Sequence, residues 1–140
     1  MICSICELDP SSHSLKKISE NENMTIYYTC PAQASKYYDS SGIIHHYNNE
    51  LNTIKSEKWM WIVDCSGYSL KHLMQHQVGI GLGELISKKH SHHLEKICII
   101  NPNWYIYSMC SIVWPFLNKK VKSIILYDNK EYISNLENMS

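Results

Sequence analysis

The sequence predicts an α/β fold, built on a mainly parallel sheet with crossover helices. Three short apolar segments, 59–64, 96–101 and 122–127, have the length and continuous hydrophobicity of strands that are buried on both faces. Helical patterns lie between them, and strands that alternate with helices form parallel sheets through right-handed crossovers. The second of these helices, 104–116, carries large apolar side chains nearly all round. We therefore expect it to cover apolar surfaces on two sides.

Length and composition fit one globular domain. The chain has 140 residues, of which 44% are hydrophobic and 19% charged, and its formal net charge is zero. It contains no arginine, and a neutral chain without guanidinium groups is a poor partner for nucleic acid. No apolar run approaches the roughly 20 residues of a membrane-spanning helix, and the N-terminus lacks the pattern of a secretory signal. The sequence thus predicts a cytoplasmic protein that does not bind nucleic acid.

The first part of the chain has the weaker signals. Residues 1–23 show no sustained periodicity and are expected to form an irregular or helical lead-in, partly disordered, before a single domain at 24–140. The segment 24–29 is β-branched and aromatic, which predicts a strand that ends before Pro31. Three further expectations follow: one or two helical turns at 32–38, an extended segment at 42–47 and a polar connection at 48–58.

Two helices besides 104–116 have recognisable start signals. Ser69 is placed to cap a helix that continues to residue 89, with leucine, valine and isoleucine at approximately helical spacing. Asp128 and Glu131 have the spacing of a capping box, which predicts a short final helix to residue 136.

Two motifs that resemble binding sites lack the context they need. Gly79, Gly81 and Gly83 lie inside a helical pattern, whereas a phosphate-binding loop lies between a strand and the start of a helix. We expect them to permit close packing, a bend or a break in the helix. Cys3 and Cys6 have zinc-ligand spacing but no second pair at tight spacing. The sequence therefore predicts neither a cofactor nor a metal.

Polar residues at two strand ends are interpreted as structural. Asp64 and Gly67 follow one strand as a turn, in which the carboxylate accepts backbone N–H groups and glycine permits positive φ. Asn101 ends the next strand. Ligands of parallel sheets bind beyond these strand ends, but no nucleophile elbow or other catalytic set is present. We therefore expect no enzymatic activity.

The helix 104–116 divides into two faces when residues are placed at about 100° intervals. Its cap is Asn101 or Asn103, and Pro115 ends it. The broad face, expected to pack on the sheet, carries Tyr105, Ile106, Met109, Cys110, Ile112, Val113 and Phe116. The opposite side carries Trp104, Tyr107 and Trp114. These aromatic side chains are either buried by the N-terminal segment or form a contact surface.

Four segments in sequence resemble the CRAL-TRIO lipid-binding domain. They are 62–67 (IVDCSG), 93–104 (HLEKICIINPNW), 114–117 (WPFL) and 122–126 (KSIIL). Their order and spacing are similar to those of the family. The chain is most similar to the divergent BCH-like branch, whose pattern is followed by Asn-Pro-Asn-Trp at 101–104 and by residues 127–131.

The resemblance implies a non-enzymatic domain whose sheet and mobile gate helix, here 104–116, enclose a hydrophobic ligand. Carried over by position, the candidates for pocket and gate are Trp61, Ile99, Trp104, Tyr105, Met109, Ile112, Val113, Trp114 and Phe116, with Lys122 on the headgroup side. The implied partner is a lipid or another hydrophobic small molecule, with peripheral membrane contact. The alternative is a BCH-type scaffold with a filled pocket, which binds a small GTPase or its regulator.

Overall fold

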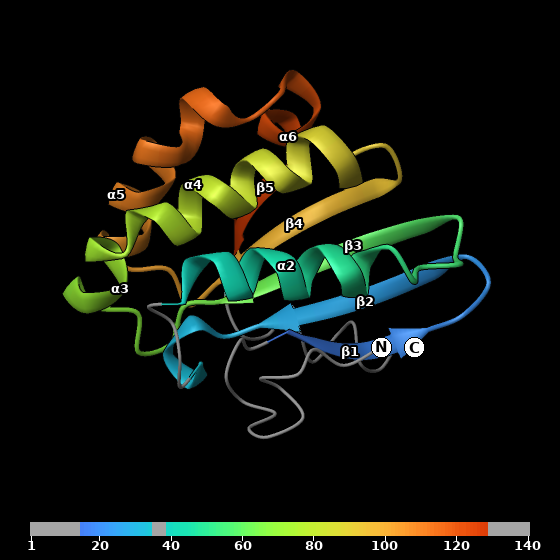
Figure 1. The fold of residues 1–140 in the computed structure, drawn as a ribbon, viewed down its shortest axis with the longest axis horizontal. Coiled ribbons are helices and arrows are strands. Elements are labelled where there is room, and N and C mark those ends of the chain that lie inside the picture. Colours follow the sequence, from blue (N-terminus) through green and yellow to red (C-terminus); the bar gives the residue numbers. More distant parts are fainter. Residues whose placement is uncertain (1–14, 35–38, 129–140) are drawn as a thin grey trace.

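The computed structural model describes residues 15–34 and 39–128, which are organised around a five-stranded sheet (Figure 1). The strands lie side by side in chain order: β1 (Lys16–Glu20), β2 (Met24–Thr29), β3 (Lys58–Asp64), β4 (Leu94–Ile100) and β5 (Ile125–Asp128). β1 is antiparallel to β2, and the other three pairs are parallel. The expected mainly parallel α/β sheet is confirmed, with one antiparallel strand added at its edge.

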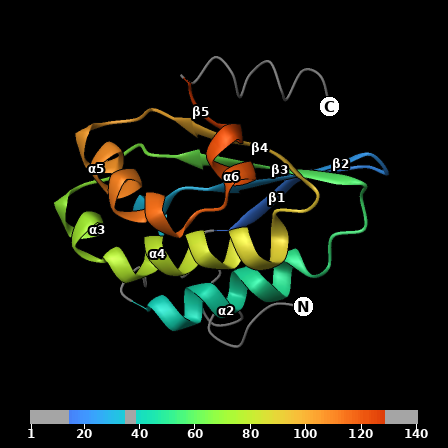
Figure 2. The same ribbon diagram turned by 90° about the horizontal axis from the view of Figure 1, so that it is seen from above.

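Helices connect the parallel strands and lie on one face of the sheet. In chain order the helical segments are η1 (Pro31–Gln33), α2 (Ser40–Leu51), α3 (Leu70–Met74), α4 (His76–Leu85), the π turn η2 (Ile86–His90), α5 (Trp104–Val113), η3 (Trp114–Phe116) and α6 (Lys119–Ile124). Because β2 to β5 are in sequential order, crossovers of one hand place their helices on the same face. α4 lies between α2 and α5 (Figure 2).

β3 has two apolar faces. Trp59 and Trp61 face the helices: Trp59 belongs to the main cluster of buried side chains, and the partly buried Trp61 packs against it. Met60 and Ile62 point to the opposite face, where they are buried. There they join a second cluster with Ile26, Cys98 and Ile100. A strand that is buried on both faces has a continuous apolar sequence, which is why the sequence identified β3 and β4.

The segment 42–47, which we expected to be extended, is helical and belongs to α2. Its β-branched residues Ile43 and Ile44 favour a strand locally. However, Ile43, Tyr47 and Leu51 recur at four-residue intervals and are all buried on one side of the helix. The packing of this stripe outweighs the local preference, and the connection expected at 48–58 accordingly begins only after Leu51.

Residues 16–20, which we expected in an irregular or helical lead-in, form the edge strand β1. Most of its side chains are exposed, and Lys17 pairs with Glu20 at 3.0 Å. Edge strands often carry charged residues, which limit pairing with other chains. A polar edge strand has no continuous apolar run, so hydrophobic patterning did not reveal it.

The helix expected at 69–89 is divided into three parts. Ser69 is the N-cap, as expected, and it forms a capping box with His72. Gln75 interrupts the helix because its backbone (φ −87°, ψ 52°) is not helical. α4 then continues into the π turn η2 before β4 begins.

The strand expected at 122–127 begins later, at Ile125. Asn118 Oδ1 accepts a hydrogen bond from Val121 N at 2.8 Å and thereby caps α6. This cap stabilises a helix at residues 119–124, although the β-branched side chains of Val121 and Ile124 favour a strand.

Some expectations concern residues outside the described ranges. These are the Cys3–Cys6 pair, residues 35–38 of the helical turns expected at 32–38, and the short helix expected after Asp128. Within the described ranges, η1 provides a single 3₁₀ turn at Pro31–Gln33. No helix in this part of the chain is long and apolar enough to span a membrane.

Candidate functional site

An apolar cavity lies between the sheet and the helices α2, α4 and α5, with a volume of about 140 Å³. Aliphatic and aromatic side chains from all of these elements form its wall. Among the residues predicted for a pocket or gate, those that line it are Trp61, Ile99, Met109 and Val113. An engineered apolar cavity of about 150 Å³ holds benzene, so this cavity has room for a group of that size.

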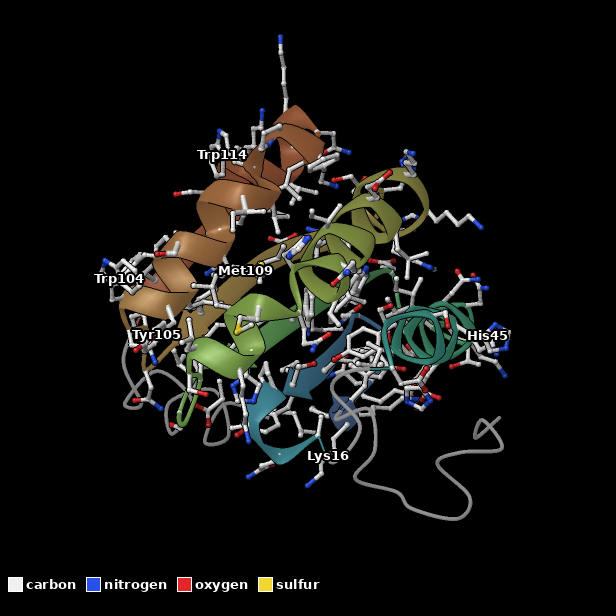
Figure 3. The ribbon with its side chains drawn as sticks, turned by 60° about the vertical axis from the view of Figure 1, so that its left-hand side comes forward. Lys16, His45, Trp104, Tyr105, Met109 and Trp114 are labelled. Carbon is white, nitrogen blue, oxygen red and sulfur yellow. The ribbon has the colours of Figure 1, made fainter. Side chains whose placement is uncertain are left out.

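α5 covers the cavity and is fixed at its N-terminus by Asn103. The side chain of Asn103 accepts a hydrogen bond from Ile106 N at 3.1 Å and donates one to Tyr68 O at 2.9 Å. Asn103, of the two candidates, is therefore the N-cap. Ile106, Met109 and Val113 are buried at helical spacing, and Figure 3 shows Met109 on the side of α5 that faces α4.

The glycines of α4 allow it to approach both neighbouring helices closely. A Cβ atom added at Gly79 would lie 2.6 Å from Met109 Sδ of α5, and one added at Gly83 would lie 2.6 Å from Val113 Cγ1. At Gly81 the added atom would lie 2.1 Å from Ile44 Cδ1 of α2. The motif therefore serves close packing along the cavity wall, which was one of the roles expected for it.

We expect Gly83→Ala to lower the free energy of unfolding by about 1–2 kcal/mol. The new methyl group meets the stiff side chain of Val113, and such overpacking costs more than the helix propensity gained from alanine. Gly79→Ala is the matched comparison and should cost less, because its nearest contact is the flexible side chain of Met109, and Val113 Cγ2 lies farther away, at 3.1 Å. Urea unfolding measures both. A Gly83→Ala variant as stable as Gly79→Ala would show that the α4–α5 contact is not tight.

The outer side of α5 and η3 carries exposed aromatic side chains. Trp104 is 70% exposed, Tyr107 47% and Trp114 43%, and Figure 3 shows Trp104 and Trp114 on this outer side. Ile112 and Phe116, expected on the packed face, are 41% and 44% exposed. The buried face of α5 is thus narrower than the sequence suggested: Ile112 lies at its exposed edge within α5, and Phe116 lies in the 3₁₀ turn η3.

The remaining pocket and gate candidates lie apart from the cavity wall. Tyr105 is partly buried and packs edge-to-face against Trp104 at 5.4 Å between ring centroids. Lys122 of α6 lies over the ring of Trp114, with 5.5 Å from Nζ to the centroid. This cation–π contact places the ammonium group beside the outer aromatic side chains.

Asp64 organises the polar turn at the ends of β3 and β4. Its carboxylate accepts hydrogen bonds from Tyr28 OH at 2.5 Å, Ser66 N at 3.0 Å and Asn101 Nδ2 at 3.1 Å. Burial raises the pKa of Asp64, but these hydrogen bonds outweigh that effect, so the pKa lies below its ordinary value. Gly67 (φ 77°) and Asn101 (φ 50°) both adopt left-handed backbone. The group has the geometry of a structural turn.

Sequence reasoning missed the hydroxyl-bearing residues of the cavity wall, which are Thr29, Tyr47 and Tyr68. Thr29 at the end of β2 and Tyr47 of α2 both line the cavity, and their side-chain oxygens are 2.9 Å apart. Tyr47 was missed because its segment was expected to be extended. The signal that was available is the four-residue spacing of Ile43, Tyr47 and Leu51.

Comparison with known proteins agrees with this arrangement. The model of the CRAL/TRIO domain matches residues 3–139. The crystal structure of Sfh5 is similar, with a TM-score of 0.62 and 8% sequence identity, over 87% of this chain and 55% of that chain. At this identity the likeness shows the fold alone, and the chain spans about half the length of Sfh5. No curated protein matches the sequence. Because the family model covers nearly the whole sequence, this chain belongs to the CRAL/TRIO domain family.

Proposed function

We propose that this chain is a non-enzymatic lipid-binding or lipid-transfer module, which holds a hydrophobic ligand between the sheet and α5. Membership of the CRAL/TRIO family supports a lipid-binding module in general. The observation that carries the proposal is the apolar cavity beneath α5, whose wall includes Trp61 and Ile99 of the sheet and Met109 and Val113 of the helix.

Burial of a lipid chain in such a site is energetically sufficient for capture. Each buried CH₂ group contributes about 0.8 kcal/mol, so a 16-carbon chain gains on the order of 12 kcal/mol before the costs of ordering and association. An empty cavity destabilises the domain. A ligand that fills the cavity therefore stabilises the folded state as well.

The cavity is too small to enclose a whole lipid chain, so we propose that part of its wall moves. A volume of about 140 Å³ accepts a group of roughly the size of benzene, which is much smaller than a lipid chain. α5 is the segment proposed to move, as the gate. It is short, and its outer side is exposed at Trp104 and Trp114.

Two measurements test the proposal. Protein purified from cells under native conditions is analysed by mass spectrometry for bound lipid, and purified protein is mixed with fluorescent acyl lipids to follow uptake. We expect a bound lipid or a saturable fluorescence increase. Val63 lines the cavity, so Val63→Phe should reduce uptake, whereas Leu126→Phe on the exposed part of β5 should not. Absence of bound lipid together with absence of uptake would contradict the proposal.

The remaining parts of the assignment are proposals of the same kind. They are a single domain, which includes β1 and so begins before residue 24, a cytoplasmic location with peripheral membrane contact, and the role of Lys122 beside a headgroup. The similarity to the BCH-like branch, with a small GTPase or its regulator as partner, depends on the sequence resemblance alone and stays a prediction.

A further inference from the structure

A hydrogen-bonded pair of hydroxyl groups lies in the cavity wall. Trp61 Nε1 donates a hydrogen bond to Thr29 Oγ1 at 2.9 Å, and Thr29 Oγ1 shares a second hydrogen bond with Tyr47 OH at 2.9 Å. Either hydroxyl group of this Thr29–Tyr47 pair can be the donor of the shared bond. The two residues are 4% and 2% exposed, so their hydroxyl groups face the interior and not bulk water.

The part of the wall formed by the described residues offers no charge to a ligand. None of the described residues that line the cavity is acidic or basic. Lys122 lies at the outer aromatic side chains over Trp114 and is not part of the wall. A carboxylate or phosphate that entered the cavity would lose its water and gain no counter-ion. A hydroxyl or carbonyl group would lose little, because the Thr29–Tyr47 pair can replace the hydrogen bonds of water.

On the basis of the lipid-binding function proposed above, we infer that the ligand is an uncharged lipid with a hydroxyl or carbonyl group, which hydrogen-bonds to the Thr29–Tyr47 pair. The direction of the hydrogen bond between the two hydroxyl groups can reverse, which suits both kinds of ligand. The pair can donate a hydrogen bond to a carbonyl oxygen, and it can accept one from an alcohol. The apolar remainder of the ligand then lies against the aliphatic wall beneath α5.

A displacement experiment with matched ligands tests this inference. The protein is loaded with the uncharged fluorescent probe N-phenyl-1-naphthylamine, which is displaced at neutral pH by hexadecan-1-ol, hexadecanoic acid or hexadecyl phosphate. The three competitors share one chain and differ only at the head. We expect the alcohol to displace the probe at a concentration at least about tenfold lower than either anion, since about 1.4 kcal/mol corresponds to tenfold in affinity.

Variants of Thr29 and Tyr47 test whether the hydroxyl pair causes the preference for the alcohol. Tyr47→Phe and Thr29→Val should each weaken displacement by the alcohol by about tenfold and leave displacement by the acid nearly unchanged, whereas Thr29→Ser should keep the preference. Tyr27→Phe is the control, because Tyr27 is a buried tyrosine whose hydroxyl donates to Glu50 O at 3.3 Å outside the cavity wall. It should not change the preference.

The possible outcomes separate the inference from the proposed function. Equal or stronger displacement by the acid or phosphate overturns the choice of an uncharged ligand. An alcohol preference that survives in both Tyr47→Phe and Thr29→Val overturns the role of the hydroxyl pair. Failure of the probe and of all three competitors to bind, in protein that unfolds cooperatively, counts against lipid binding itself.

Discussion

A disulfide between α5 and α4 is expected to abolish lipid uptake, and reduction of the disulfide is expected to restore it. The double variant Gly83→Cys/Val113→Cys places the two thiols suitably. A Cβ atom at position 83 lies 2.6 Å from Val113 Cγ1, so the two Cβ atoms are within the range of about 3.5–4.5 Å that a disulfide requires. Because a cavity of about 140 Å³ is too small for a whole lipid chain, a covalent bond that holds α5 on α4 should prevent entry.

The measurement is the rate of uptake of a fluorescent acyl lipid, with and without a reducing agent. The single variants Gly83→Cys and Val113→Cys are the controls, because they report any cross-link to the half-buried native Cys110 of α5. Protein that is loaded before oxidation should retain its lipid, since release uses the same opening. Equal uptake by the oxidised and reduced double variant would show that the ligand enters without separation of α5 from α4.

The elements that the sequence predicted correctly are those with one dominant local signal. β3 and β4 are continuous apolar runs because both of their faces are buried. The start of α3 was visible in Ser69. Gly79, Gly81 and Gly83 were recognised as packing residues because a phosphate loop needs glycines before a helix, not within it.

The errors arose where long-range packing or a cap outweighs local preference. Residues 42–47 have strand-like side chains, but they form a helix because Tyr47 packs edge-to-face against Trp61 of β3 at 6.0 Å. The Asn118 cap shortened β5 in the same way. Phe116 lies in the 3₁₀ turn η3, which a uniform helical wheel does not contain, and Ile112 lies at the edge of a buried face that is narrower than the wheel suggested.

The candidate site shows the same limit. Met109 and Val113 were identified as members of the broad face of a helix, and the structure places them in the cavity wall. The contact between Thr29 and Tyr47 joins residues that are 18 positions apart in sequence. It depends on how α2 crosses the sheet, so no local pattern indicates it.

Asp64→Ala is expected to lower the free energy of unfolding by about 3–5 kcal/mol, the largest stability effect that we predict. The substitution leaves the backbone N–H of Ser66 and the side chains of Tyr28 and Asn101 without their acceptor. Asp64→Asn should cost less, about 1–2 kcal/mol, because an amide has the same shape but forms weaker hydrogen bonds than a carboxylate. Ser66→Ala is the comparison within the same turn: it keeps the backbone N–H that binds Asp64 and loses only the contacts of the Ser66 hydroxyl, such as that with Asn101 Nδ2 at 2.9 Å, so it should cost less than Asp64→Ala. Urea unfolding at neutral pH measures all three.

The pH dependence of this effect has a definite sign. The pKa of Asp64 is lower in the folded chain than its ordinary value, which is about 3.9 for an unfolded aspartate. The ionised carboxylate therefore contributes its full stabilisation above about pH 4, and this contribution is lost as the pH falls through the folded-state pKa. The stability difference between the unaltered protein and Asp64→Asn should accordingly shrink below about pH 4 in unfolding curves. The contrary result would be a stability difference that grows on acidification. It would mean that the folded chain binds the proton more tightly than the unfolded chain. Asp64 would then be neutral in the turn, and its three hydrogen bonds would not be those of a carboxylate.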